Sequence, residues 1–250
     1  MGLSKGLGAG LGAGLGAAAL AALTPGAAGA VVGGAPDAGP LSRQTVMVLG
    51  SGGHMCTGVV VARDAVLTAA HCVAAAESRV HYRDPDGRPV LLEPRARASH
   101  PAYDRGAIQG RRRSVDLALI RLAEPLPARF ETAALSGADH RAGARLVLGG
   151  YGVAAPGDAR STGTFRTATL PVVEPHGPSR LLVWLRGSGG GACTGDSGGP
   201  VADEAGVVAV ATWATGPNGC GGVSQGVLVA PQRDWIDRTL EAWGARAEWR

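Results

Sequence analysis

Short apolar runs recur along this chain of 250 residues, and Gly, Pro, Asp or Asn follows each run within a few positions. The clearest runs cover residues 59–61, 65–68, 117–122, 146–148, 181–185 and 207–213. Runs of this length favour β-strands, because helices in folded proteins need a longer amphipathic stretch. Many short strands joined by tight turns indicate an all-β barrel or sandwich.

One helix is expected close to the end of the chain, at about residues 233–244. Asp234 begins a stretch that carries Ile236 and Leu240 at helical spacing, and Gly244 can end it. The composition agrees, because 41 glycines and 16 prolines suit turns better than long helices. With 45% hydrophobic residues the chain can still form a large core.

The segment 1–30 holds no acidic residue and a single basic one, Lys5. Gly, Ala and Leu fill residues 6–23, and the segment closes on Ala28-Gly29-Ala30. This layout predicts a secretory signal peptide over 1–30, whose removal leaves a mature extracellular domain over 31–250. A retained membrane anchor is disfavoured because Gly and Ala gain little from hydrocarbon. A low-complexity tail is the other alternative.

The net charge is small, with 24 Lys and Arg against 20 Asp and Glu, or +4. Nucleic-acid binders concentrate a larger basic excess on one face, so no nucleic-acid partner is expected. Arg111 to Arg113 form the densest basic run. Three consecutive arginines in a polar stretch favour a solvated loop over a docking patch.

The four cysteines form no C-x-x-C pair, so zinc and thioredoxin-like sites have no supporting spacing. Export would allow disulfides, and reduced intracellular thiols are the alternative. Three pairings are possible, and the cysteine positions alone do not choose between them. If cysteines that are neighbours in sequence paired, each disulfide would close a short loop and stabilise the fold by about 3 kcal/mol in the chain-entropy model. The cysteines are Cys56, Cys72, Cys193 and Cys220.

The sharpest chemical signal is Gly-Asp-Ser-Gly-Gly-Pro at residues 195–200. Glycines allow the tight turns through which main-chain N–H groups converge on one spot, as an oxyanion site requires. Ser197 is therefore a candidate nucleophile, and a plain surface turn is the weaker interpretation. A serine hydroxyl is unreactive at its own pKa, so a base must lie nearby.

Two further residues are candidates for that base and for the acid that orients it. His71 stands out among six histidines because it follows the apolar run ending at Thr68 and precedes Cys72. A lone histidine is more often structural or exposed. Asp116 comes directly before the apolar run 117–122, where it would be desolvated and need a partner. An aspartate facing water at a strand entry is the alternative.

These segments, in this order, resemble the chymotrypsin/trypsin family of serine endopeptidases. They are Val31-Val32-Gly33-Gly34, Thr68 to Cys72, Asp116 to Ile120 and Gly195 to Pro200. The order His, Asp, Ser is specific, because other folds that carry such a triad use other orders. The resemblance covers nearly all of residues 31–250. It implies two antiparallel six-stranded β-barrels, at about 31–138 and 139–232, with the active cleft between them.

The resemblance also implies a role for each site residue. Ser197 is expected to attack the scissile carbonyl, His71 to move the proton and Asp116 to orient the imidazole. The N–H groups of Gly195 and Ser197 would bind the oxyanion. Neither a cofactor nor a metal is implied. The implied disulfides are Cys56 with Cys72 and Cys193 with Cys220.

A specificity pocket follows from the same resemblance. Gly191 stands where trypsins carry an aspartate at the pocket base, and a buried cation without a partner is unfavourable. We therefore expect cleavage after apolar residues and not after Arg or Lys. Ala214, where glycine is usual, would narrow the entrance and favour medium side chains. The expected lining residues are Gly191, Ala192, Thr212, Trp213, Ala214 and Gly226.

Val31 would become the new amino terminus and pair with Asp196, the acid before the nucleophile. In the family this pairing organises the oxyanion site. Because the candidate signal cleavage falls directly before Val31, signal removal alone is expected to produce the active enzyme.

Some features depart from the family pattern. Thr212 replaces the usual serine but keeps a hydroxyl that could reach Asp116, and Tyr151 replaces a customary tryptophan. Few disulfides and a single lysine suggest a bacterial protein. The competing class is a secreted binding protein on the same fold without catalysis, disfavoured because Ser197, His71 and Asp116 are all present. Substrates are expected to be proteins or peptides, and the enzyme a monomer without membrane attachment.

Overall fold

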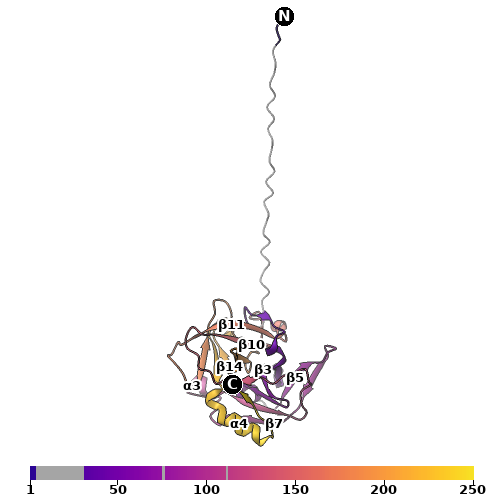
Figure 1. Cartoon of the computed structure of the whole chain (residues 1–250), viewed down its shortest axis with the longest axis vertical. Helices are drawn as coiled ribbons and strands as arrows, with labels where there is room; N and C mark the ends of the chain where they lie inside the picture. The colour runs from indigo at the N-terminus through magenta and orange to yellow at the C-terminus, as the bar shows by residue number, and fades with distance from the viewer. Residues whose placement is uncertain (4–30, 75–76, 111) are drawn as a thin grey trace.

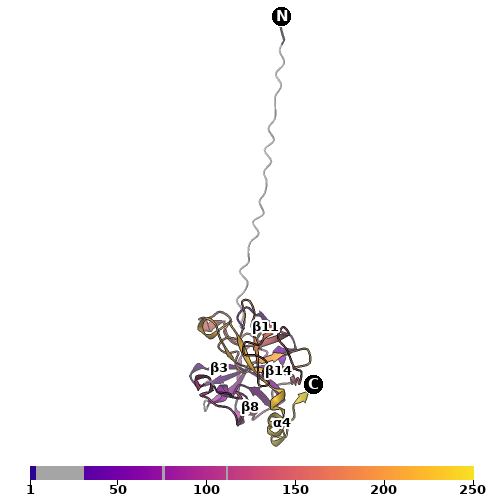
Figure 2. The same ribbon diagram turned by 90° about the vertical axis from the view of Figure 1, so that its left-hand side faces the viewer.

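The computed structural model describes residues 1–3, 31–74, 77–110 and 112–250, and the side chains of all of these except 108 and 109. The expected signal segment therefore lies outside the described residues apart from its first three. The strands form two sheets, one from the first half of the domain and one mostly from the second (Figure 1). Helix α4 (Arg233–Ala242) lies at the edge of the molecule in both views (Figures 1 and 2; Figure 2 is turned by 90°).

The first sheet has seven strands in the order β6-β5-β2-β3-β4-β8-β7, and all neighbours are antiparallel. Its central strands β3 and β4 are apolar and buried almost throughout, whereas the edge strand β7 alternates half-buried and exposed residues. The strands are β2 (Thr45–Gly50), β3 (Met55–Ala62), β4 (Ala65–Thr68), β5 (Ser78–Arg83), β6 (Pro89–Leu92), β7 (Pro94–Ser99) and β8 (Ala118–Leu122).

Six strands of the second sheet close into an antiparallel barrel, because β13 pairs with both β10 and β14. Three short strands extend this sheet: β1 pairs with β11, β9 with β14 and β16 with β9. The barrel strands are β10 (Arg145–Gly150), β11 (Arg166–Val173), β12 (Leu182–Leu185), β13 (Pro200–Ala202), β14 (Val207–Ala214) and β15 (Ser224–Leu228). The extensions are β1 (Ala35–Pro36), β9 (Ala134–Leu135) and β16 (Glu248–Trp249).

The first half differs from the expected closed barrel. Among the described residues its end strands β6 and β7 do not pair, so the sheet is a half-barrel. A side chain bridges the gap: Arg97 on β7 donates to the Ser78 hydroxyl and carbonyl, each at 2.7 Å. The expected boundary near residue 138 also differs from sheet membership, since β1 and β9 precede it and belong to the second sheet.

A shared core lies between the two halves. It joins Leu67 and Leu117 of the first half to Val210 and Val227 of the second, and Leu240 of α4 packs against them. Burying an aliphatic side chain of this size stabilises the fold by about 1.5–3 kcal/mol. This core therefore holds the halves together and fixes the cleft between them.

The predicted helix near the end of the chain is confirmed as α4 (Arg233–Ala242). Ile236 and Leu240 are its fully buried residues, and Gly244 follows with a φ of 73°, which glycine adopts readily. No helix among the described residues is long and apolar enough to cross a membrane. The shorter helices are α1 (Pro40–Arg43), α2 (Ala70–Val73), α3 (Ala107–Gly110) and the 3₁₀ turns η1 (Ser51–Gly53), η2 (Ala159–Ser161), η3 (Pro217–Gly219) and η4 (Ala230–Gln232).

Candidate active site

His71 and Asp116 meet because their strands are neighbours. In the antiparallel pair β4 and β8, Thr68 lies opposite Ala118, so the residues just after β4 and just before β8 share one edge of the sheet. His71 Nδ1 lies 2.7 Å from Asp116 Oδ2, and the His71 backbone N–H donates to Oδ1 at 2.9 Å. An ionised carboxylate only accepts hydrogen bonds, so Nδ1 carries the proton and Nε2 is left to accept one.

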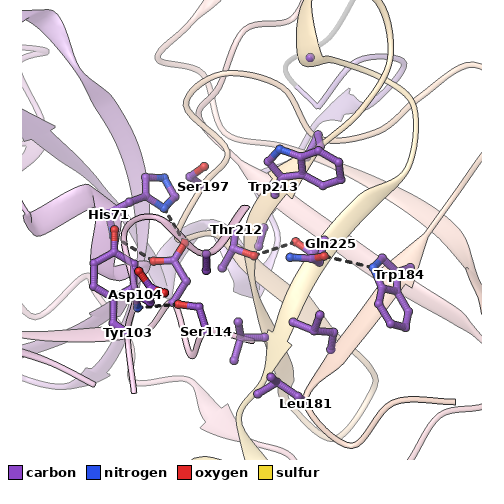
Figure 3. A pocket seen from close by; sticks show the side chains of 18 of the residues that line it. His71, Tyr103, Asp104, Ser114, Leu181, Trp184, Ser197, Thr212, Trp213 and Gln225 are labelled. Atoms are coloured by element: carbon purple, nitrogen blue, oxygen red, sulfur yellow. Dashed lines mark hydrogen bonds and ion pairs between the residues drawn. The ribbon is translucent and has the colours of Figure 1, made fainter. Parts of the chain in front are cut away.

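Ser197 lies at the same cleft as His71, on the opposite half of the molecule (Figure 3). Its backbone is held from the first half, since the Thr57 N–H donates to the Ser197 carbonyl at 2.8 Å. Among the described residues no hydrogen bond joins the Ser197 hydroxyl to the His71 ring. Catalytic contacts of this kind are often long before substrate binds and tighten afterwards.

The Gly195 peptide is oriented by two hydrogen bonds. The carbonyl of Thr194 accepts from the Val153 N–H at 2.8 Å, which turns the Gly195 N–H of the same planar peptide to the opposite side. The Gly195 carbonyl accepts from the Thr57 hydroxyl at 2.8 Å. Gly195 has a φ of 99°, and a Cβ there would lie 2.5 Å from Met55 Cε. Only glycine suits this position.

The Ser197 amide is oriented in the same way. The carbonyl of Asp196, in the same peptide as the Ser197 N–H, accepts from the Gly199 N–H at 2.9 Å. Among the described residues, neither the Gly195 N–H nor the Ser197 N–H donates to another protein group. Two fixed amides without protein acceptors are what an oxyanion site needs.

Thr57 connects the two halves at this point. Besides its bonds to the Gly195 and Ser197 carbonyls, its hydroxyl accepts from the Tyr151 N–H at 3.1 Å. Its own carbonyl accepts from the Thr68 hydroxyl at 2.8 Å. Thr57 is fully buried, so these bonds are shielded from water.

Asp196 is buried behind the nucleophile segment with its carboxylate facing backbone N–H groups. Oδ1 accepts from Gly152 at 2.8 Å and Oδ2 from Cys193 at 2.9 Å. Burial raises the pKa of Asp196 to about 7, and hydrogen bonds from Cys193, Gly152 and Val31 oppose that rise. Val31 is itself fully buried and has a φ of 50°, which is strained for a β-branched residue.

Both disulfides have the pairing that the resemblance implies. Cys56 is bonded to Cys72, directly after His71, and Cys193 is bonded to Cys220. The ligand-type atoms of Cys56, Cys72 and His71 lie within 4.8 Å of one another. Because the two sulfurs are bonded to each other, neither offers the thiolate that a metal site would use.

A cleft of about 1160 Å³ extends from His71 and Ser197 between the halves. Of the expected pocket residues, four line it: Ala192, Thr212, Trp213 and Ala214. Thr212 does not bond Asp116 in this structure; its hydroxyl donates to the Gln225 carbonyl at 3.4 Å, and the Gln225 side chain accepts from Trp184 Nε1 at 3.2 Å (Figure 3).

Gly191 and Gly226 do not line the cleft. A Cβ on Gly226 would point into the barrel, 3.2 Å from Ala209 Cβ. The β15 residues that line the cleft are Gln225 and Val227, which sequence reasoning missed. The buried Ser224 hydroxyl accepts from the Ala192 N–H at 2.8 Å and lies 2.9 Å from where a Cβ on Gly191 would be. Strand β14 has a register shift between Ala211 and Trp213, where it pairs with β15. No sequence signal marks that bulge.

The described part of the arginine run, Arg112 and Arg113, is exposed and lies in a loop, as the sequence favoured. Arg112 and Arg113 line the cleft, together with Arg105. Arg111 lies outside the described residues.

Comparison with known proteins adds three findings. A family model described as Trypsin matches residues 31–236. Trypsin epsilon of Drosophila erecta is 27% identical over 241 residues, which cover 87% of this chain and 90% of that protein. Serine protease 1 of Homo sapiens is 27% identical over 187 residues, covering 67% and 72%. These relatives are animal proteins, so the bacterial origin suggested by composition is not supported.

Solved structures show the same fold. Neuropsin, a serine protease expressed in mouse brain, has a TM-score of 0.69 at 23% identity and covers 82% of this chain and 98% of its own. Human heparin binding protein has a TM-score of 0.70 at 25% identity, covering 84% and 97%.

Proposed function

Since this chain belongs to the trypsin family of serine endopeptidases, we propose that Ser197, His71 and Asp116 carry out its peptide-bond hydrolysis. The observation that carries the assignment is the double contact of Asp116 with His71, at 2.7 Å to Nδ1 and 2.9 Å to the backbone N–H. It presents Nε2 as a base at the cleft that also contains Ser197.

In the proposed reaction the Ser197 hydroxyl oxygen attacks the scissile carbonyl while His71 Nε2 takes its proton. The tetrahedral intermediate collapses when the imidazolium gives that proton to the leaving amine, which leaves an acyl group on Ser197. Water then repeats the two steps, again with His71 as base and acid, and releases the carboxylic acid. Asp116 stays ionised and stabilises the imidazolium throughout.

The oxyanion of each tetrahedral intermediate would accept hydrogen bonds from the Gly195 and Ser197 amides. Because protein bonds to the neighbouring carbonyls already orient these amides, little reorganisation is needed as charge develops. One such donor is worth about 100-fold to 1000-fold in kcat in related chemistry.

We further propose that cleavage before Val31, as signal removal would provide, completes the site. Cleavage would relieve the strained φ of Val31 and place an α-ammonium group beside the buried Asp196 carboxylate. In this ion pair the α-ammonium group is the positively charged partner that the buried carboxylate otherwise lacks. A longer secreted form that gains activity only on later trimming to Val31 would contradict activation by signal removal alone.

For specificity we propose apolar side chains before the cleaved bond. Ala192 and Ala214 line the cleft together with Ser197, and Gln225 of β15 adds only a neutral amide. The acids that line the cleft, Asp104 and Asp116, are both paired with other residues. We expect leucyl, alanyl or phenylalanyl peptides to be cleaved faster than arginyl ones, and the reverse order would overturn this assignment.

The decisive experiment treats secreted protein with a fluorophosphonate probe, which reacts only with an activated serine. We expect mass spectrometry to find the label on Ser197 and an amino terminus at Val31, with no label on a Ser197→Ala control. A folded protein that takes no label would instead favour the silent binding protein.

A further inference from the structure

One wall of the cleft carries an excess of positive charge. Arg105, Arg112 and Arg113 line it, from the segment between β7 and β8. Arg112 pairs with Asp104 at 2.7 Å, and Asp116 is engaged by His71. Across residues 31–74, 77–110 and 112–250, no carboxylate pairs with Arg105 or Arg113. The remaining residues contain no acid at all.

Arg105 is held close to the reacting groups. Its Nη2 donates to the Ala74 carbonyl at 3.1 Å, directly after α2, the helix that carries His71. Tyr103 lines the same cleft as Arg105 and Asp116. Burial and the Asp116 charge raise the pKa of Tyr103, and Arg105 opposes that rise. The Arg105 guanidinium is therefore part of the cleft and within electrostatic reach of the site.

The opposite wall is apolar. Leu181, Leu182, Trp184 and Trp213 line it, and Figure 3 shows Leu181, Trp184 and Trp213 across the cleft from Tyr103 and Ser114. Successive side chains of an extended peptide point to opposite sides. A peptide lying between these walls would therefore present alternate side chains to the arginines and to the apolar surface.

Building on the proposed function, we propose that this cleft selects peptides that have an apolar residue directly before the cleaved bond and an acidic residue further upstream. Ala192 and Ala214, assigned above to the residue directly before that bond, belong to the same continuous cleft as the arginines. In this proposal the upstream part of the substrate lies along the arginine wall. A guanidinium group can bind a carboxylate through two parallel hydrogen bonds, whereas a lysine there would be repelled.

The test uses peptides that differ only by Glu or Gln at one position, scanned on both sides of the cleaved bond. The readout is the Glu-to-Gln ratio of kcat/KM within each variant, which cancels any general loss of activity or folding. For the unmodified protein we expect a ratio of about five at an upstream position, consistent with one or two partly exposed ion pairs. The ratio should fall as salt is raised, because screening weakens such pairs.

Substitution then assigns the effect. In Arg105→Gln/Arg113→Gln the ratio should fall to about one, and in Arg105→Glu/Arg113→Glu a Lys peptide should be preferred over its Glu counterpart. The matched control is Arg95→Gln, an exposed arginine on β7 that does not line the cleft, and it should keep the parental ratio. A parental ratio near one, a preference confined to downstream positions, or an unchanged ratio in the double variant would overturn the proposal.

These outcomes are separate from those of the proposed function. Protein that labels at Ser197 but shows no Glu preference would refute only the substrate proposal. Protein that neither labels nor cleaves would refute the proposed catalytic function as well.

Discussion

Two histidine–aspartate pairs lie in different regions of the molecule, and different ring nitrogens of the histidines make the contact. His71 Nδ1 lies 2.7 Å from Asp116 in the cleft, and His140 Nε2 lies 3.0 Å from Asp203 on the second half. The cleft pair is the more open one, with 38% of the His71 side chain exposed against 17% for His140.

The two pairs also differ in the other groups that surround them. Asp203 accepts from the backbone of Ala205 and Gly206 at 2.8 Å each and from the Ser136 hydroxyl at 3.2 Å. That hydroxyl bonds the carboxylate, so it is not presented to the imidazole as a nucleophile. The pair at the cleft has a separate serine and two oriented amides nearby. A histidine beside an aspartate therefore identifies a site only together with these neighbours.

The largest expected difference comes from changing one carboxylate in each pair to its amide. Asp116→Asn should lower kcat about 10⁴-fold, because the amide no longer holds the imidazole in the tautomer that accepts the Ser197 proton. Asp203→Asn should leave kcat within about two-fold, since it lies outside the cleft. Steady-state hydrolysis of one apolar peptide measures both, and similar losses in the two variants would erase the distinction.

A second substitution tests the oriented amides of Gly195 and Ser197, which lie near the cleft pair and not near the other pair. Gly195→Ala should lower kcat about 100-fold or more, because its Cβ would lie 2.7 Å from Gly152 Cα and displace a donor. The control is Gly143→Ala near His140, where φ is also positive at 90° but no atom lies within 4 Å of the added Cβ. If Gly143→Ala lost as much activity, backbone strain and not the amide would explain the effect.

The pair outside the cleft should matter for stability. Burial acts to raise the pKa of Asp203, but hydrogen bonds from Gly206, Ala205, His140 and Ser136 outweigh it and the pKa is lowered. The carboxylate therefore stabilises the fold above about pH 4, and this contribution is lost as pH falls through the lower folded value.

We expect Asp203→Asn to lower the free energy of unfolding by about 1–3 kcal/mol at pH 7, because its amide N–H₂ would face the Ser136 and His140 donors. The difference should shrink toward pH 3. Urea unfolding at both pH values measures it, and an equal difference at pH 3 and pH 7 would contradict the assignment.

The last expected effect concerns Asp196, a carboxylate with no histidine partner. With residue 30 still attached to Val31, its pKa of about 7 exceeds the ordinary value, so the folded state holds the proton more tightly than the unfolded state. Stability should then fall as pH rises from about 4 to 7, by at most ~1.4 kcal/mol per unit. In protein that begins at Val31 the α-ammonium should remove this slope. Urea titrations of the two forms that superimpose would argue against the ion pair.

Much of the fold follows from local pattern. The runs at 65–68 and 117–122 are apolar because β4 and β8 are central strands, and antiparallel pairing then brings His71 to Asp116. The family resemblance supplies the pairing of halves, which no local pattern contains.

What escaped sequence reasoning depends on long-range geometry. Gln225 and Val227 of β15 line the cleft where Gly226 was expected, next to a register shift on β14 that no sequence pattern marks. The end strands β6 and β7 of the first half do not pair among the described residues, and Arg97 of β7 instead bonds Ser78 of β5. Arg113 lines the cleft through the path of the loop between β7 and β8, which no local pattern defines.

The hydrogen bonds of Thr57 determine what would follow if the chain were cut into two fragments between the first sheet and the second barrel. This residue belongs to the first sheet, yet it bonds the carbonyls on both sides of Asp196 in the second half. A fragment that ends before the second barrel would contain His71 but not Ser197. The remaining fragment would contain Ser197, but its loop would lack the hydrogen bonds that Thr57 makes. Mixing the two fragments should therefore restore peptide hydrolysis only when Thr57 of strand β3 again bonds the Gly195 and Ser197 carbonyls.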